Sequence, residues 1–395
     1  MPCPHCQQAA GYHVDRERTL VSLVGTLHCR RACYYCRLCG KGLAPFDQQA
    51  GITPRQLTPA VERLATLAGA VCPGFERGAD LLFETAGVRL SEATVERTTQ
   101  DVGQRLAEVL GQGMVFGAPA DWEWHKDAQG RSVAYFTIDA TGTRQQGPKG
   151  KAAEGRMAYV AGVYNPAPPE WLRPAGTKTP PLVARYLSGL YPLAALGPLL
   201  RQQAAQVGME RAALWIALTD GGSGLEEFCQ HNFNRPDLVL ILDFYHAADY
   251  LKDLARALYP QQPEQAKEQG EQWCRLLKAE GGAVTLAVLR QWDWPARKNA
   301  ALSQQWQKVQ EYFGNNLHRM DYPEYEAQGW QIGSGVVESA CKTVVGQRLK
   351  GAGMRWSEAG AHALCHVRAL YRSEKGQWEA FWSGDLRKTK VYQLN

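Results

Sequence analysis

Four short apolar runs, rich in β-branched and aromatic residues, most constrain the fold of this chain of 395 residues. They span residues 133–138, 157–164, 212–218 and 238–242. A loop joins the first two runs, whereas helical sequence precedes each of the last two. Continuous apolar runs of this length are typical of buried strands, and strands that alternate with helices build a sheet covered by helices. The sequence therefore predicts a mixed α/β sheet.

Three of these runs end in an aspartate: Asp139, Asp220 and Asp243. We expect the sheet to deliver their side chains to a shared edge. Hard divalent cations take oxygen ligands, and two such ions about 4 Å apart can promote phosphoryl transfer. A lone aspartate after a strand is more often a turn or cap residue, but three predict a magnesium or manganese site. His246 either packs in the fold or cooperates with Asp243.

A fourth acidic candidate, Glu338, lies in a segment of glycine, serine and valine residues. If Ser334 caps the helix that follows, Glu338 stands in its first turns, where the helix dipole favours an ionised carboxylate. Four basic residues come next, interrupted by glycines that let a phosphate chain approach the backbone. These candidates for phosphate binding are Lys342, Arg348, Lys350 and Arg355.

Two Cys-x-x-Cys pairs stand near the start of the chain, a spacing that places four thiolates around one zinc ion. Sequence of this length buries little apolar surface, so a bound metal would supply its folding energy. The alternatives are that Cys29 and Cys33 serve as ligands, or that the thiols are free. The predicted zinc ligands are Cys3, Cys6, Cys36 and Cys39.

The region between the cysteines and the first strand has helical periodicity over residues 57–110. A helix from Phe75 to Ala86, a glycine turn and a helix capped by Ser91 follow the pattern of a helix-turn-helix. Its second helix would present Arg97 and Arg105 to DNA, although plain helical packing explains the pattern equally well.

Composition sets broad limits on the function. A net charge of +5 and a pI near 8.6 are compatible with a polyanionic partner. The 11 cysteines are an odd number and several are scattered singly, which does not favour a disulfide framework. We find no apolar run near the roughly 18 residues of a membrane span and no signal segment. We therefore expect a cytoplasmic protein with no membrane partner.

At this point the chain resembles bacterial insertion-sequence transposases of the DDE type, most closely the Kra-type group. Four motifs carry the resemblance: Ile138-Asp-Ala-Thr-Gly142, Thr219-Asp-Gly-Gly222, Leu242-Asp-Phe-Tyr-His246, and residues 333–356, which begin Gly-Ser-Gly-Val-Val-Glu338. The resemblance implies a ribonuclease H-like core in which Asp139 and Glu338 are catalytic. By similarity to Mutator and hAT transposases, Asp220 is the second metal-binding aspartate, and Asp243 with His246 supplies an accessory motif. The rival assignment makes Asp243 the second catalytic aspartate.

The same resemblance implies how the chain is divided and what it does. The expected parts are a zinc ribbon (1–46), a helical DNA-binding region (55–118), the first part of the core (130–246), a helical insertion (247–328), the last core helix (329–372) and a tail (373–395). The implied function is binding of the terminal inverted repeats and target DNA, as a homo-oligomer, with metal-dependent strand cleavage and transfer. The alternatives are an inactive DNA-binding regulator and a structure-specific nuclease.

Overall fold

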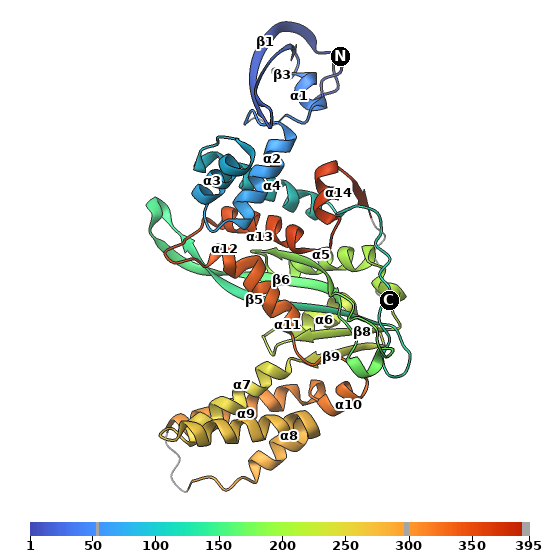
Figure 1. Ribbon diagram of the computed structural model, residues 1–395, viewed down its shortest axis with the longest axis vertical. Helices are drawn as coiled ribbons and strands as arrows, with labels where there is room; N and C mark the ends of the chain where they lie inside the picture. The colour runs from blue at the N-terminus through green and yellow to red at the C-terminus, as the bar shows by residue number, and fades with distance from the viewer. Residues whose placement is uncertain (53–54, 296–299, 389–395) are drawn as a thin grey trace.

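The computed structural model describes residues 1–52, 55–295 and 300–388, so the predicted linker position at Thr53-Pro54 lies outside the described residues. The molecule is elongated, with a cysteine-bearing β-hairpin at one end, helices over a central sheet in the middle, and a helical domain at the other end (Figure 1). Within the described residues, none of the helices combines the length and the apolar character that crossing a membrane requires.

The central sheet confirms the predicted mixed α/β class. Its five strands are β5 (Val133–Gln146), β6 (Ala152–Asn165), β7 (Val183–Gly189), β8 (Leu214–Thr219) and β9 (Leu238–Leu242). Their spatial order is β7-β6-β5-β8-β9. β6 is antiparallel to both of its neighbours, whereas β5, β8 and β9 run parallel.

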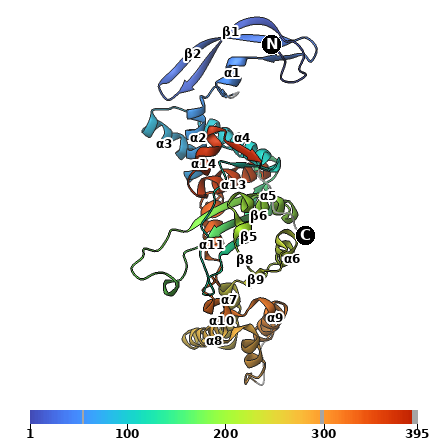
Figure 2. The ribbon, with the colours of Figure 1, turned by 90° about the vertical axis from the view of Figure 1, so that its right-hand side faces the viewer.

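Strand β7 was missed by the sequence analysis. It follows a proline-rich excursion that loops away from the sheet (Figure 2). Within β7 the basic Arg185 interrupts the apolar pattern, yet its side chain is 1% exposed because Glu374 and Gln206 accept its hydrogen bonds. A buried cation with a distant partner carries no local signal, which explains the omission.

The N-terminal part is a small antiparallel sheet. Strands β1 (Gly11–Ser22) and β2 (Gly25–Cys36) pair along their length, and β3 (Lys41–Leu43) adds to β2. Pro45-Phe-Asp47, where a proline after the cysteine module is typical of a linker, instead begins helix α1 (Pro45–Gln49). Asp47 forms ion pairs with Arg18 and Arg31 of the hairpin, and these contacts hold α1 against it.

Three helices link this hairpin to the sheet: α2 (Pro59–Val71), α3 (Phe75–Ala86) and α4 (Glu92–Gly111). The predicted bounds of α3 and the Ser91 cap are confirmed, since Ser91 Oγ accepts the Thr94 N–H at 3.2 Å. α4 packs closely on α13 (Glu358–Arg372), where a Cβ atom at Gly103 would lie 2.1 Å from the Ala363 oxygen. Glycine is therefore required at this crossing.

Among the described residues, most of the chain from Phe244 to Ala327 is helical, as predicted for the insertion. Its helices are α7 (Phe244–Leu258), α8 (Pro263–Arg290), α9 (Ala300–Asn316) and α10 (Tyr322–Ala327). A tryptophan cluster fills its interior, with Trp273 buried against Trp292 at a ring distance of 5.2 Å. The insertion begins and ends at one point, because the Phe244 N–H donates to the Ile332 oxygen at 2.8 Å.

After the insertion, α11 (Gly335–Ala340) widens into a π-helical turn (Cys341–Gly346) and continues as α12 (Gln347–Leu349). The segment that we expected to be a tail folds back as α14 (Gln377–Ser383) and β10 (Leu386–Lys388), which pairs with β4 (Met114–Phe116). Residues 389–395 of that expected tail lie outside the described residues.

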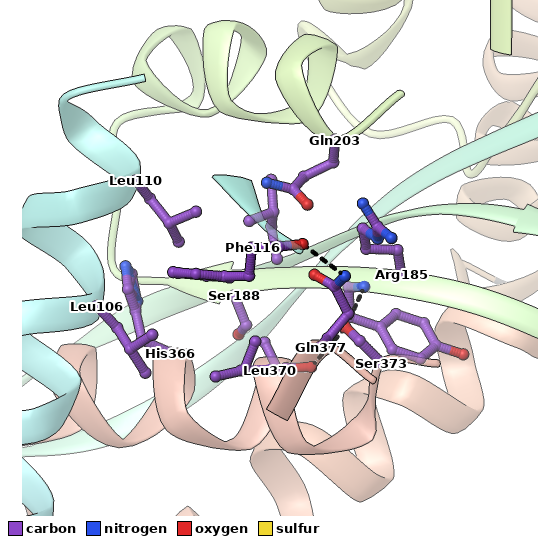
Figure 3. A pocket seen from close by; sticks show the side chains of 13 residues that line it. Leu106, Leu110, Phe116, Arg185, Ser188, Gln203, His366, Leu370, Ser373 and Gln377 are labelled. Atoms are coloured by element: carbon purple, nitrogen blue, oxygen red, sulfur yellow. Dashed lines mark hydrogen bonds between the residues drawn. The ribbon is translucent and has the colours of Figure 1, made fainter. Parts of the chain in front are cut away.

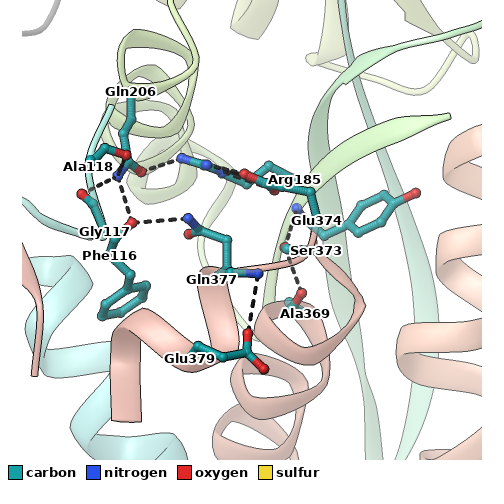
Figure 4. A network of polar contacts seen from close by, with 12 residues as sticks. Phe116, Gly117, Ala118, Arg185, Gln206, Ala369, Ser373, Glu374, Gln377 and Glu379 are labelled. Atoms are coloured by element: carbon teal, nitrogen blue, oxygen red, sulfur yellow. Dashed lines mark hydrogen bonds and ion pairs between the residues drawn. The ribbon is translucent and has the colours of Figure 1, made fainter. Parts of the chain in front are cut away.

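A buried polar network fixes this C-terminal segment (Figure 4). Arg185 of β7 bonds both Glu374 and Gln206, and the Gln377 amide donates to the Phe116 oxygen at 3.0 Å. Gln206 also donates to the Phe116 oxygen, at 2.7 Å. Because each buried polar group finds a partner across elements, the network joins α5 (Leu193–Gln206), β4 and α14 to the sheet.

Candidate metal centres

The three aspartates stand in register at one edge of the sheet. Ile138 of β5 pairs with Thr219 of β8, and Thr219 pairs with Leu242 of β9. Asp139, Asp220 and Asp243 are the residues that follow this row. Since paired residues of parallel strands point to the same face of a sheet, the strands bring the first two carboxylates to neighbouring positions. The predicted convergence at a shared edge is confirmed for the backbone.

Asp139 lies in a partly buried position within β5. Burial raises the pKa of its carboxyl, the Ala140 N–H bond and the Cys341 thiol lower that pKa, and the charge of Asp220 raises it. Cys341 Sγ donates to Asp139 Oδ2 at 3.3 Å. The electrostatic coupling with Asp220 and with His246 shows that the three side chains share one region.

Asp220 has few hydrogen bonds and is partly exposed. Its Oδ1 accepts the Gly222 N–H at 2.9 Å. Burial raises the pKa values of Tyr250 and Tyr312, and the charge of Asp220 raises them further; the two rings stack at 4.0 Å. A Cβ atom at Gly221 would lie 2.4 Å from Tyr312, so the glycine after Asp220 lets this tyrosine close over the turn.

Asp243 is fully buried and occupied by hydrogen bonds. It caps α7 by accepting the N–H groups of Tyr245 at 2.6 Å and His246 at 3.1 Å. Its second oxygen accepts the Ser334 N–H at 2.8 Å and also the Ser334 hydroxyl. Both carboxylate oxygens therefore tie the start of the insertion to the loop that leaves it.

Ser334 does not cap α11 with its side chain, contrary to the expectation from the sequence. Its hydroxyl is committed to Asp243 instead, and it also lies 3.5 Å from Glu338 Oε1. Glu338 does stand in the first turn of α11, as predicted. Gly333 precedes it, where a Cβ atom would lie 2.4 Å from the Tyr245 ring.

The donor atoms of Asp243, His246 and Glu338 all lie within 4.8 Å of one another, so these three residues can hold a metal ion. Among the described residues, Asp139 and Asp220 lie outside this group of three, although their charges act on the same region. Carboxylate oxygens and an imidazole suit a divalent cation such as magnesium or manganese. The arrangement can thus present up to four carboxylates and one histidine at one sheet edge.

The basic residues after Glu338 divide into two kinds. Lys342, Lys350 and Arg355 are exposed, and the Lys350 ammonium bonds the Thr141 hydroxyl beside Asp139. Arg348 is different: it is 1% exposed and its Nε donates to the Gly69 oxygen at 3.1 Å. The prediction that Arg348 contacts phosphate is therefore wrong for this conformation, because its guanidinium is enclosed between Phe75 and Trp356.

The two arginines predicted for the second helix of the helix-turn-helix also differ. Arg97 is exposed on α4. Arg105 forms an ion pair with Glu62 of α2 at 3.4 Å and faces the ring of Phe381. Its side chain is 45% exposed. Arg97 is accordingly the freer of the two for a contact with DNA, while Arg105 links three elements of the fold.

The four cysteines of the two Cys-x-x-Cys pairs converge at the N-terminus, and Cys29 and Cys33 lie outside this cluster. The Sγ atoms of Cys3 and Cys39 are 3.6 Å apart, and those of Cys6 and Cys36 are 3.5 Å apart. A tetrahedral zinc site with Zn–S bonds of about 2.3 Å has sulfur atoms about 3.8 Å apart. The geometry of the thiols thus fits one zinc ion.

Backbone groups prepare this cluster for metal. The N–H of Cys39 lowers the pKa of Cys36 to about 7, and the N–H of His5 lowers that of Cys3. Thiolates are the form that binds zinc, so one thiol of each knuckle favours that form without metal, whereas the pKa values of Cys6 and Cys39 are raised and these two thiols would lose their protons on binding zinc. No structural disulfide competes, since all 11 cysteines are free.

A small cavity of about 20 Å³ lies between α4, α13 and β7 (Figure 3). Leu106, Leu110 and Leu370 form much of its wall. His366 beside it has a pKa lowered to about 3 by burial, so its imidazole is neutral. A cavity of this size holds about one water molecule, and it therefore has no room for a substrate.

Sequence reasoning missed the partners of the acids. Ser334 and Cys341 each bond an aspartate from more than 90 positions away, and Tyr312 closes over Asp220. Their one sequence signal is position: both Ser334 and Cys341 flank Glu338 within one helical turn.

Searches of protein-family models and of curated proteins gave no match for this chain.

Proposed function

We propose that this protein is a DNA transposase of the DDE type. The observation that carries the proposal is the register Ile138–Thr219, which makes Asp139 and Asp220 the next residues of two parallel neighbouring strands. Glu338, near the start of α11, follows the helical insertion, and its carboxylate lies within 4.8 Å of the donor atoms of Asp243 and His246 at the same edge of the sheet. The Kra-type resemblance of the motifs agrees with this arrangement.

The sheet order supports a ribonuclease H-like core. The sheet is mixed, with the antiparallel strands β7, β6 and β5 beside the parallel strands β8 and β9, as the resemblance leads us to expect. Fold alone does not specify chemistry, so the proposal depends on the acidic residues and not on the sheet.

Asp220 is the better second metal ligand. Asp243 lies within 4.8 Å of the donor atoms of His246 and Glu338, but it is fully buried and already accepts four hydrogen bonds, so a metal ion at its carboxylate would have to displace some of them. Asp220 accepts one backbone bond and remains partly exposed. Asp139, Asp220 and Glu338 would therefore hold the catalytic magnesium or manganese, while Asp243 positions α7 and His246 beside them.

Bound divalent cations would activate the attacking water or 3′-hydroxyl and stabilise the leaving oxygen. The chain itself supplies the orientation of these groups. Lys350 stands beside Thr141, two residues from Asp139, where its ammonium can meet a phosphate oxygen. Lys342 and Arg355 add exposed positive charge within the same segment, residues 333–356.

The N-terminal hairpin would act as a zinc ribbon that helps to select DNA. It lies at the far end of the molecule from the insertion (Figure 1), and α2–α4 stand between it and the sheet. Together with Arg97 on α4, this region would contact the terminal repeats. Joining two element ends requires two bound ends, so we expect a homo-oligomer on DNA.

An excision and strand-transfer assay in cells tests the proposal. Asp139→Asn, Asp220→Asn and Glu338→Gln should each abolish excision, and exposed Lys375→Gln should not. Full activity in the Asp139 or Glu338 variant contradicts the proposal. Activity that survives Asp220→Asn but not Asp243→Asn reverses the assignment of the second aspartate. Cleavage without joining would identify a nuclease, and repeat binding without magnesium-dependent cleavage would identify a regulator.

A further inference from the structure

The hairpin of β5 and β6 continues beyond the five-stranded sheet as a two-stranded arm. β8 last pairs with β5 at Ile138, and β7 last pairs with β6 at Tyr159. The two long strands remain paired with each other up to Gln146 and Ala152. Residues 141–158 therefore form an arm that projects from the sheet, on the left of Figure 1.

This arm is strongly basic. Residues 141–158 contain Arg144, Lys149, Lys151 and Arg156, all exposed, against the single acid Glu154. The segment before α13 lies along the same strand, since the Trp356 N–H donates to the Arg144 oxygen at 3.1 Å. It brings Lys350 and Arg355 beside the arm. Among the described contacts of these four residues and of Lys350 and Arg355, the one ion pair joins Arg156 to Glu358 at 3.7 Å. Lys350 donates a hydrogen bond to the Thr141 hydroxyl.

The tip of the arm holds a lysine in an unfavourable conformation. Lys149 has φ of 56° and Gly150 has φ of 75°, so two consecutive residues are left-handed. Such turns favour glycine or asparagine, because a side chain clashes with the backbone there. A lysine costs stability at this position, and no hydrogen bond or ion pair compensates among the described contacts. Strained residues of this kind cluster at sites of ligand contact.

From these observations we infer that the β5–β6 arm, with Lys350 and Arg355 at its base, holds the phosphate backbone of duplex DNA next to the acidic centre. The inference rests on the proposed function for the identity of the polymer. It adds a surface that the catalytic residues do not include, and it places that surface in the chain immediately after Asp139.

The composition of the arm selects duplex DNA over other polyanions. Residues 141–158 contain no aromatic side chain, although proteins that hold single strands stack bases on aromatic rings. Met157 is the one large exposed apolar residue of the arm, which is too little for the core of a protein interface. A two-stranded ribbon enters the major groove of B-form DNA but not the narrow major groove of A-form RNA.

The length of the arm gives its reach. Six residues from Thr141 to Gln146 span about 20 Å at about 3.3 Å each, which equals about six base pairs at about 3.4 Å each. We therefore expect the contacted phosphates to begin at the cleaved bond and to extend over roughly half a helical turn of the flanking duplex.

The test is equilibrium binding of the zinc-loaded protein to a labelled random duplex of about 30 base pairs, without added magnesium, across a series of salt concentrations. The variant is Arg144→Ala, Lys149→Gly and Lys151→Ala combined. Removing three phosphate contacts should lower the salt slope by about 2 to 3 and weaken binding roughly a hundredfold or more at about 0.1 M salt. Lys149→Gly alone should weaken binding while the Tm stays equal or rises, because glycine suits the turn.

The matched control replaces two exposed lysines far from the arm, Lys178→Ala and Lys375→Ala. Equal slopes for the triple variant and the wild type would overturn the inference, as would tighter binding of single-stranded DNA or duplex RNA. A wild type that binds no duplex overturns both proposals. Loss of binding in the variant, combined with no magnesium-dependent cleavage by the wild type, supports the arm and contradicts the transposase. Unchanged duplex binding by the variant, combined with normal magnesium-dependent cleavage by the wild type, supports the transposase and contradicts the arm.

Discussion

The cysteine cluster and the acidic centre are built in opposite ways. Cys3 and Cys39 meet across 36 positions of a small sheet with little core, whereas Cys341 reaches Asp139 across 202 positions through the main sheet. We expect the cysteine module to depend on a bound metal for its structure, because a sheet of this size buries too little apolar surface. The acids have a hydrophobic sheet beneath them, so their fold does not require the metal.

Charged ligand side chains therefore affect the free energy of folding differently in the cysteine cluster and in the acidic centre. The thiolates are part of the folding energy of their module. The carboxylates act against it, since burial raises the pKa of Asp139 and so opposes its charged form. Removing metal should unfold the first centre and leave the second intact.

Chelation of zinc should give the largest effect. Structural zinc contributes on the order of 10 kcal/mol to small metal-dependent modules, so Cys36→Ser or chelation should unfold residues 1–46 and abolish recognition of the terminal repeats. Hydrogen exchange would show rapid exchange in β1–β3 and normal protection in β5–β9. Cys274→Ser, which changes a thiol outside the cluster, is the control. Global unfolding on chelation would make the hairpin part of the core's scaffold.

Loss of a catalytic carboxylate should affect rate but not folding. Asp220→Asn should reduce magnesium-dependent cleavage by at least about a thousandfold, or about 4 kcal/mol of transition-state stabilisation. The thermal midpoint should change little, since Asp220 is partly exposed and accepts one backbone bond. Single-turnover cleavage and calorimetry on the same sample separate the two effects. A large fall in the midpoint would assign Asp220 a structural role.

Asp243→Ala, unlike Asp220→Asn, should lower the free energy of unfolding. It removes a helix cap and leaves the buried Ser334 hydroxyl and N–H without their partner, at a cost of about 3 kcal/mol. Denaturant unfolding measures this loss, with Asp249→Ala on the exposed face of α7 as the control. A stable Asp243 variant would contradict the conclusion that Asp243 ties the start of the insertion to the loop that leaves it.

Alanine variants of Arg348 and Arg355 should have different effects, because one side chain is packed in the core and the other is exposed. Burial lowers the pKa of Arg348 to about 10, and its guanidinium bonds Gly69 inside the core. Arg348→Ala should therefore cost about 2 to 3 kcal/mol of stability. Arg355→Ala, at an exposed position, should leave stability within about 0.5 kcal/mol of the wild type and weaken duplex binding.

The smallest effect concerns pH. Because the pKa of Asp139 in the folded protein lies above its ordinary value of 3.8, its contribution to stability is present below that value and is lost as pH rises through the folded pKa. Asp139→Asn should thus stabilise the magnesium-free protein by about 1 kcal/mol at neutral pH, and this gain should vanish in acid. Thermal scans from acidic to neutral pH measure it; a gain independent of pH would point to packing.

Much of the fold could be predicted from the sequence because its signals are local. The apolar runs, the Ser91 cap and the glycine turn after Ala86 each act within a few residues, and the structure confirms them. β7 and the return of β10 to β4 could not be predicted, because they depend on partners distant in the chain.

The same contrast applies to the candidate site. The row of three aspartates followed from strand ends alone. The burial of Arg348 did not, because a Gly/Lys/Arg segment has the same composition whether its cation faces phosphate or the rings of Phe75 and Trp356. The bond between Ser334 and Asp243 was equally hidden, since the insertion separates the two residues in sequence.

The closed neck of the insertion has a consequence for how such a chain can change. A backbone hydrogen bond joins Phe244 to Ile332, and beside it the Asp243 carboxylate accepts a hydrogen bond from the Ser334 N–H. The chain therefore leaves and re-enters the core at adjacent points, as in domains whose close ends tolerate insertion. The helices between these points also contact the core: Arg319 donates to the Thr219 hydroxyl, and the Tyr322 hydroxyl donates to the Leu242 oxygen. A replacement of the insertion would have to keep these contacts at the ends of β8 and β9 to leave Asp220 and Asp243 in place.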